Sequence, residues 1–407
     1  MKKFSWFLTL VLVLFFAVSC GDSKKEEKEK PDTDTDEISD EEPAETDGDA
    51  EPAVIDEDNE TSDEELAPTP LECEDFAEGL NENLIVGEGA NKLERSFILR
   101  LPENIDSDAK LPVIFLYHGY GDSAGNFANL LGSYVNNKTM PFILVVPESR
   151  GDIYGFNIPP TGLDWDMMNL TDGSAEGDMF DAVLACLEKR WKIDEKHIHV
   201  SGFSAGAITA NSMGLMKPEK IASILSYSGA YFSDQASRDD LGEIMGMKVG
   251  DFFSWPDFAE EHTKYPQVFI YGDEENDSWG MSGFTIYFNR MARFGAAYLN
   301  GLGHDTILCN HGKEHTVAGI NQNGLIKFFN DHPFGTVESP YREALPEEFA
   351  EICHFFTEDD IIVDEPEDPE DPNGTPENPD EEPENPEETP DETPEIPDEH
   401  PCVMPDC

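Results

Sequence analysis

One serine stands in a pattern that is typical of a nucleophile. Ser204 is the centre of Gly202-Phe203-Ser204-Ala205-Gly206, which follows a strand-like run at 197–201 and precedes a helix-like run at 205–216. A turn this tight holds the serine in a strained conformation with its Oγ above the sheet, and side chains at the flanking glycines would clash. The turn also directs the backbone N–H of Ala205, at the helix N-terminus, toward a developing oxyanion. The pattern therefore predicts a nucleophile elbow.

A second glycine-rich segment could complete the oxyanion site. Residues 113–117 form a continuous apolar run, which predicts a strand buried on both faces, and His118-Gly119-Tyr120-Gly121 follows it directly. In a parallel sheet, ligands bind at the carboxyl ends of the strands. We therefore assign the second oxyanion donor to the backbone N–H of Tyr120.

A serine hydroxyl needs a histidine to take its proton and a carboxylate to orient that histidine. In folds where a nucleophile elbow follows a strand of a parallel sheet, the three residues occur along the chain in the order serine, acid, histidine. The loop after the predicted strand 267–271 offers four carboxylates, Asp273, Glu274, Glu275 and Asp277. Asp277 is preferred as the acid, and Asp273 and Glu275 stay open as alternatives.

The histidine is expected after the last predicted strand and before the closing helix. His311 and His315 are both candidates, and His304 is a weaker one. His315 is preferred because it lies farther into the loop, at the entry to the helix, which leaves His311 a structural hydrogen-bonding role. His197 and His199 alternate on a strand and are expected to pack.

Strand patterns alternate with helix patterns through the middle of the chain. The predicted strands are 94–101, 113–117, 142–146, 197–201, 221–227, 267–271 and 306–309, and the predicted helices are 178–191, 205–216, 284–299 and 319–330. Such alternation predicts an α/β fold, with a mostly parallel sheet covered by helices on both faces.

Four segments together resemble the polyhydroxybutyrate depolymerase-like and feruloyl-esterase-like α/β-hydrolases. They are the elbow, the His-Gly-Tyr-Gly strand end, the acid loop with Asn-Asp-Ser at 276–278, and Cys-Asn-His-Gly-Lys-Glu-His-Thr at 309–316. The resemblance covers roughly residues 81–353. Relatives often have Cys-Asp-His-Gly-Gly-Gly-His-Thr before the final helix, and this correspondence places the catalytic histidine at His315.

The acid loop departs from the His-Gly-x-x-Asp pattern of these relatives. Tyr271 replaces the histidine and the loop is longer. The resemblance therefore does not decide among the candidate acids. It implies an α/β-hydrolase fold and secreted carboxylic-ester hydrolysis, without fixing the ester.

The leading hypothesis is an exported serine esterase that acts through an acyl-enzyme on polyesters or on feruloyl- or acetyl-type polysaccharide esters. The alternatives are a peptidase of the same fold and a catalytically inactive, polymer-binding lipoprotein. Tyr120, Trp165 and Trp279 could line the substrate site or could be ordinary core or rim residues. Trp165 and Trp279 are the candidates for substrate binding. The sequence has neither an HExxH motif nor paired CxxC motifs, so no metal and no cofactor are expected.

The two ends of the chain differ from its middle. Residues 1–19 predict a lipoprotein signal peptide, because the small residues before Cys20 resemble a bacterial lipobox. Cys20 is then the site of lipidation, and the protein lies in the bacterial cell envelope. The alternative is a plain secretory signal and an extracellular protein. Residues 20–70 and 358–407 are rich in acids and proline and predict disordered segments that flank a catalytic domain at 71–357. The net charge of -61, from 87 Asp plus Glu against 26 Lys plus Arg, argues against nucleic-acid binding.

Six cysteines remain after Cys20, in a chain whose predicted export permits disulfides. Cys186 lies in an amphipathic helix pattern and is expected to be a buried free thiol. Cys309 ends the last strand, and Cys353 lies in a segment with little regular structure. A Cys309–Cys353 bridge would hold that segment to the strand, and the resemblance supports this pairing.

Overall fold

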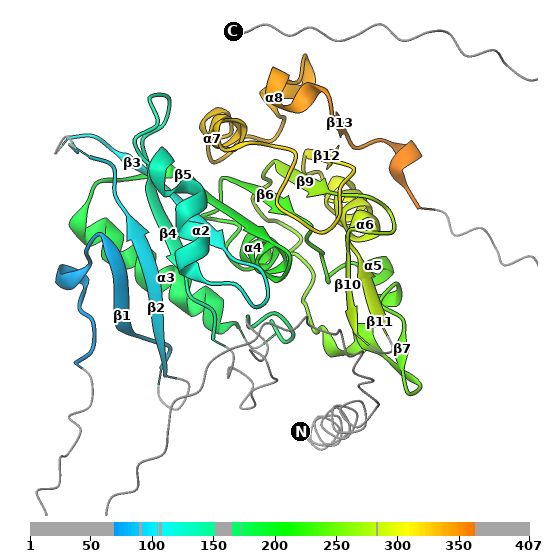
Figure 1. Cartoon of the computed structure of the whole chain (residues 1–407), viewed down its shortest axis with the longest axis horizontal. Coiled ribbons are helices and arrows are strands. Elements are labelled where there is room, and N and C mark those ends of the chain that lie inside the picture. The colour runs from blue at the N-terminus through cyan, green and yellow to red at the C-terminus, as the bar shows by residue number, and fades with distance from the viewer. Residues whose placement is uncertain are drawn as a thin grey trace, which may run out of the picture. The chain divides into compact units, whose positions relative to one another are not determined.

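The structure is a computed structural model that describes residues 69–88, 92–103, 105, 108–150, 165–171, 173–281 and 284–362. Within these residues the chain forms a nine-stranded sheet in the order β1-β2-β4-β3-β5-β6-β9-β12-β13 (Figure 1). The sheet strands are β1 Gly79–Val86, β2 Leu93–Arg100, β3 Leu111–Tyr117, β4 Ile143–Pro147, β5 Ile193–Phe203, β6 Ser223–Tyr227, β9 Gln267–Tyr271, β12 Thr306–Asn310 and β13 Cys353–Phe355. The predicted signal peptide and Cys20, and nearly all of the two acidic tails, lie outside the described residues.

The six central strands run parallel, and the outer strands are antiparallel. Strands β4, β3, β5, β6, β9 and β12 pair in parallel, whereas β1 and β2 at one edge and β13 at the other pair antiparallel. All seven residues of β3 are buried, as expected for a central strand covered on both faces. This arrangement confirms the predicted mostly parallel sheet.

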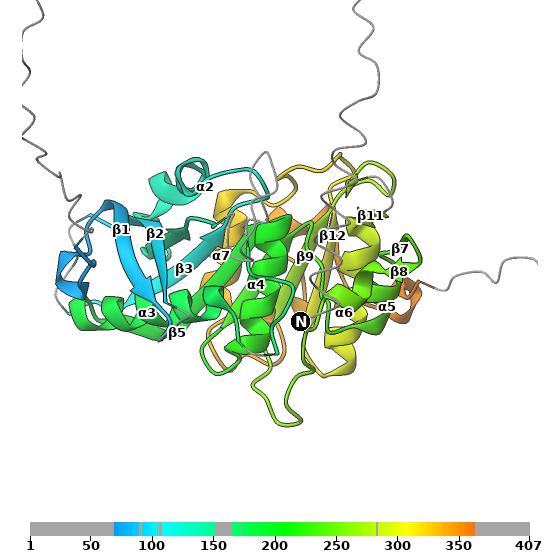
Figure 2. The same ribbon diagram turned by 90° about the horizontal axis from the view of Figure 1, so that it is seen from below.

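Helices cover both faces of the sheet (Figure 2). They are α2 Ala124–Leu131, α3 Ala175–Arg190, α4 Ala205–Met216, α5 Gln235–Asp239, α6 Phe288–Gly301, α7 Gln322–Asp331 and α8 Glu347–Ala350. Successive side chains of β3 alternate between the faces, as the period of a strand requires. Val113 and Phe115 pack with α3 and α4, whereas Ile114 and Leu116 pack with α2 and α7.

Helix α3 shows why a predicted helix forms where it does. Ser174 precedes it in an extended conformation, and its side chain accepts a hydrogen bond from the backbone N–H of Glu176. Acidic residues occupy its first turn, and Lys189 and Arg190 occupy its last turn, which complements the helix dipole. The helix thus begins three residues before the predicted start at 178.

One predicted helix is partly wrong. The segment predicted as a helix at 284–299 begins with a strand, β11 Phe284–Tyr287, that pairs with β10 Ser278–Met281 in a hairpin, and α6 starts only at Phe288. The run Phe-Thr-Ile-Tyr is aromatic and β-branched, and such residues favour a strand when a partner strand is available. A second small hairpin joins β7 Glu243–Ile244 and β8 Met247–Lys248.

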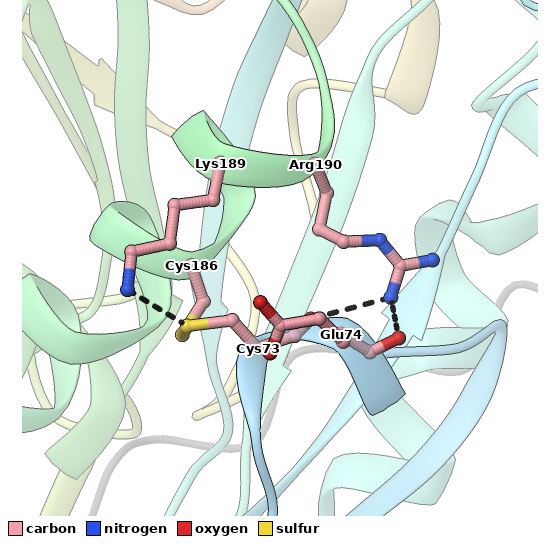
Figure 3. Close-up of a disulfide and its surroundings, with 5 residues drawn as sticks. All are labelled: Cys73, Glu74, Cys186, Lys189 and Arg190. Atoms are coloured by element: carbon pink, nitrogen blue, oxygen red, sulfur yellow. Dashed lines mark hydrogen bonds between the residues drawn. A yellow bond between two sulfur atoms is a disulfide. The ribbon is translucent and has the colours of Figure 1, made fainter.

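Two disulfides tie peripheral segments to the sheet and its helices. The predicted Cys309–Cys353 bridge is confirmed, and it joins β12 to the edge strand β13. The prediction for Cys186 is wrong, because this cysteine pairs with Cys73 (Figure 3). Cys186 is buried as expected, but the helix face that it occupies is covered by the 3₁₀ turn that contains Cys73.

Ordered contacts extend slightly beyond the predicted end of the catalytic domain at 357. The side chain of His354 lies 2.8 Å from a carboxylate oxygen of Asp360, and Arg293 Nε donates to the backbone oxygen of Asp360. The predicted domain boundaries all stay predictions. Within the described residues, no helix is both long and apolar enough to cross a membrane.

Candidate active site

The predicted elbow has the geometry that its glycines require. Ser204 lies between β5 and α4 with φ 56° and ψ -123°, a backbone conformation that is strained for a residue with a side chain. A Cβ added at Gly202 would lie 2.3 Å from the backbone oxygen of Gly206, and one at Gly206 would lie 2.3 Å from the backbone oxygens of Tyr117 and His118. Only glycine fits at either position, so the turn can form only with this spacing.

The acid loop and the histidine loop are held together by backbone hydrogen bonds. The N–H of Asp273 donates to Lys313 O at 2.8 Å, and the N–H of His311 donates to Tyr271 O at 2.9 Å. Both loops leave neighbouring parallel strands, β9 and β12, at the carboxyl edge of the sheet, where the elbow also lies. The sheet therefore brings all three predicted segments to one edge.

Of the candidate acids, Asp277 is the one that contacts a histidine. Its Oδ1 lies 2.7 Å from Nδ1 of His315, and its side chain is fully buried. Its Oδ2 accepts hydrogen bonds from the N–H of Gly272 at 2.7 Å and from Oγ of Ser228 at 2.9 Å. The carboxylate is therefore held at both oxygens, with one oxygen directed at the imidazole.

The two alternative acids point elsewhere. Asp273 accepts hydrogen bonds from the backbone N–H groups of Glu275 and Asn276, which lower its pKa, and its carboxylate serves only its own loop. Glu275 is exposed. Neither side chain makes a hydrogen bond to a histidine among the described residues.

The ring of His315 is packed as well as hydrogen-bonded. The rings of Phe203 and Phe288 both stack on it with centroids 4.6 Å away, at interplanar angles of 30° and 10°. Phe203 directly precedes Ser204, so this stacking places the imidazole beside the elbow. Aromatic faces can also stabilise the imidazolium that forms when the ring accepts a proton.

The other candidate histidines have structural surroundings. Burial lowers the pKa of His311, whose Nδ1 accepts from the N–H of Lys313. His304 packs on Tyr265 and His262, and burial lowers its pKa to about 3. His199 is buried, with its Nδ1 2.9 Å from Ser223 Oγ, in the packing role predicted for it.

The predicted oxyanion loop, residues 118–121, lies against the elbow. In the register of β3 with β5, Tyr117 pairs with Gly202, so the following residues, including Tyr120, lie next to the turn at Ser204. Glu148 fastens this loop at two points, since its Oε1 lies 3.1 Å from His118 Nε2 and its Oε2 accepts from the N–H of Ala124. Ala205 is the first residue of α4, as predicted.

Of the two tryptophans expected to bind substrate, Trp165 is not placed to do so. It is fully buried, its Nε1 donates to His118 O at 3.0 Å, and its ring packs edge-on against Tyr117. Its hydrogen bond to His118 therefore helps to hold the predicted oxyanion loop in place. Trp279, on the β10–β11 hairpin, is partly buried and packs edge-on against Tyr120, with ring centroids 5.8 Å apart.

Two residues at the site were not identified from the sequence. Ser228 and Glu148 each follow a fully buried parallel strand, β6 and β4, at the edge where the other site residues lie. A polar side chain just past a buried strand is the signal that could have found them. Within the described residues, no group of three or more histidine, cysteine or acidic side chains is placed to hold a metal ion.

Part of the chain is similar to known proteins. The model of a family described as Phospholipase/Carboxylesterase matches residues 104–243, which include the predicted oxyanion loop and the elbow. Feruloyl esterase D of Neurospora crassa is 28% identical over 155 residues, 37% of this chain and 50% of that protein. A probable dipeptidyl-peptidase 5 of Aspergillus clavatus is 25% identical over 193 residues, 43% of this chain and 25% of that protein. The chain thus spans no more than half the length of these curated relatives.

Solved structures share the fold at low sequence identity. Native sOPH has a TM-score of 0.52 at 16% identity, over 69% of this chain and 94% of that one. Native pOPH has a TM-score of 0.50 at 19% identity, over 70% of this chain and 96% of that one. Identity this low shows the fold alone. Together with the sheet order, these comparisons show that the chain has the α/β-hydrolase fold, with a region similar to the phospholipase/carboxylesterase family.

Proposed function

We propose that this protein is an exported serine esterase that hydrolyses carboxylic esters through an acyl-enzyme. The observation that carries the proposal is the buried Asp277–His315 hydrogen bond, with the imidazole stacked on the residue that precedes Ser204. This contact supplies the acid–base part of the arrangement that nucleophilic catalysis by serine uses, since the acid fixes the tautomer and orientation of the base.

In the proposed mechanism, Ser204 Oγ attacks the ester carbonyl carbon and transfers its proton to Nε2 of His315. The backbone N–H groups of Tyr120 and Ala205 stabilise the oxyanion, and Asp277 stabilises the imidazolium. The tetrahedral intermediate then collapses, and His315 returns the proton to the leaving alcohol. Water, activated by the same imidazole, hydrolyses the acyl-enzyme and restores the serine.

The acyl group of the proposed substrate would lie near Tyr120 and Trp279. Their edge-on pair joins the oxyanion loop to the hairpin that follows the acid, so an apolar or aromatic surface borders the reacting carbonyl. Feruloyl and polyester acyl groups could both pack on such a surface. A polymeric ester outside the cell would be accessible to a protein held at the cell surface. The similarity to a feruloyl esterase supports the first of these.

The test is covalent labelling of the purified protein by a fluorophosphonate, together with hydrolysis of p-nitrophenyl and feruloyl esters. Labelling and hydrolysis should both disappear in Ser204→Ala, with a loss of about 10⁴- to 10⁶-fold in kcat. If Ser204→Ala stayed within about tenfold of the parent, another group would have to be the nucleophile.

A second candidate function is peptide hydrolysis by the same residues. The similarity to a probable dipeptidyl-peptidase supports it, and peptidases and esterases share the acyl-enzyme chemistry. Parallel assays with p-nitrophenyl esters and with dipeptidyl p-nitroanilides discriminate the two. A higher kcat/KM for the anilides would favour the peptidase.

We also propose that the protein is anchored in the bacterial cell envelope by lipid on Cys20. Small residues precede this cysteine after an apolar run at 4–18. Two disulfides in the described part of the chain support an oxidising compartment outside the cytosol.

A further inference from the structure

Ser228 has an unusual backbone conformation for its position in the fold. It follows β6 directly, is fully buried, and has φ 49°, in the left-handed region that favours glycine. Its N–H donates to Ile270 O at 2.7 Å, which fixes the turn against β9. Glycine would adopt this conformation without strain. Position 228 nevertheless has a serine, although its backbone conformation disfavours a side chain.

The hydroxyl of Ser228 is directed at the predicted catalytic acid. Its Oγ donates to Oδ2 of Asp277 at 2.9 Å, beside the N–H of Gly272 at 2.7 Å. These two donors occupy Oδ2, so Oδ1 is left for Nδ1 of His315. Strained residues persist where the surrounding structure holds them, and they cluster at functional sites.

We propose that Ser228 is a positioning residue for the catalytic acid, whose hydroxyl fixes the carboxylate of Asp277 so that Oδ1 faces the base. This inference rests on the proposed serine-hydrolase function. Without the hydroxyl, Oδ2 keeps one donor, and the buried carboxylate can rotate away from His315. Because a hydrogen bond to a charged group is among the stronger ones in a protein, we expect kcat to fall about 10- to 30-fold, with KM within about twofold.

Two substitutions separate positioning from a structural role. Both Ser228→Ala and Ser228→Gly remove the hydroxyl, but alanine keeps the strained backbone and glycine relieves it. Both variants should lose the same activity, whereas Ser228→Gly should melt no lower than Ser228→Ala. The proposal would be overturned if the variant with the lower melting temperature lost activity and the more stable variant kept it.

The matched control is Ser226→Ala. Ser226 is a buried serine in β6, two residues before Ser228, and its hydroxyl has no hydrogen-bond partner among the described residues. This variant should keep kcat within about twofold of the parent, because it removes no hydrogen bond to the acid.

A spectroscopic measurement tests the inference independently of any ester. The His315 Nδ1–H proton, hydrogen-bonded to Asp277, should give a low-field resonance in the proton spectrum, identified by its loss in Asp277→Asn. Ser228→Gly should shift or abolish it, and Ser226→Ala should leave it in place. If Ser228→Gly leaves the resonance unchanged, the positioning role is wrong. Absence of hydrolysis by the parent protein would instead count against the proposed function.

Discussion

Replacing Asp277 by asparagine should disable the site through the tautomer of His315. The amide oxygen of asparagine must take the position of Oδ2, because Gly272 N–H and Ser228 Oγ–H both donate there. The amide NH₂ then faces Nδ1 of His315 in place of the carboxylate oxygen. An NH₂ group cannot accept from an N–H, so the ring is driven to carry its proton on Nε2. That tautomer cannot take the proton of Ser204.

The expected loss in kcat is about 10⁴-fold, the size found when the acid of such a triad is replaced by its amide. At about 1.4 kcal/mol for each factor of ten, this corresponds to about 5.5 kcal/mol of lost transition-state stabilisation. The fold should persist, since asparagine has nearly the same volume and keeps the hydrogen bonds to Gly272 and Ser228.

The assay is steady-state hydrolysis of a p-nitrophenyl ester, with Asp273→Asn as the matched control in the same loop. Asp273 lies at the surface and accepts only from its own loop, so this control should stay within about threefold of the parent. The reasoning would be refuted if Asp277→Asn kept more than about 1% of kcat, or if Asp273→Asn were the disabling change.

Three further predictions follow from the termini, the disulfides and the oxyanion loop. Cys20→Ser should release the protein from the membrane fraction or block its processing, and a mature N-terminus without lipid at another residue would contradict the anchor. The double variant Cys309→Ser/Cys353→Ser should lose about 4 kcal/mol of stability by the chain-entropy model for a separation of 44 residues, which differential scanning calorimetry measures. It should also lose ester hydrolysis below its melting temperature, because the histidine loop loosens. Burial raises the pKa of Glu148, but hydrogen bonds from His118 and from backbone N–H groups outweigh it and lower the pKa below 4.5. The stabilisation by Glu148 is therefore present above about pH 4.5 and lost as pH falls through the folded pKa, so melting curves of the parent and Glu148→Gln should differ at neutral pH and converge in acid.

The sequence was sufficient for the features that depend on local pattern. The turn at Ser204 requires the two glycines, because a Cβ atom at either position would lie 2.3 Å from a backbone oxygen, so the motif was a reliable sign of the turn. The continuous apolar run at 113–117 predicted a central strand because only burial on both faces tolerates such a run. These inferences need no knowledge of which distant segments meet.

The sequence favoured Asp277 as the acid but could not exclude Asp273 and Glu275, because the choice depends on which side chain turns inward. Asp277 is buried, and the β10–β11 hairpin starts directly after it. The sequence pattern predicted a helix in place of the second strand of that hairpin, so it did not show how this loop is folded. The Cys73–Cys186 bridge escaped prediction for a similar reason. Its partners are separated by 113 residues, and no local pattern shows that the N-terminal turn covers α3.

The β10–β11 hairpin is bounded at both ends by residues that touch the imidazole. Asp277 binds the ring just before the hairpin, Phe288 stacks on it just after, and the N–H of Phe288 donates to Asp277 O at 2.9 Å. Ser278 pairs with Tyr287 inside this closure. The hairpin thus lies between two fixed residues, Asp277 and Phe288. We expect that its length and its aromatic residue Trp279 can vary while His315 keeps its position. If the protein is the proposed esterase, we expect that hairpins grafted between Asp277 and Phe288 alter its substrate range and leave the contacts of the imidazole in place.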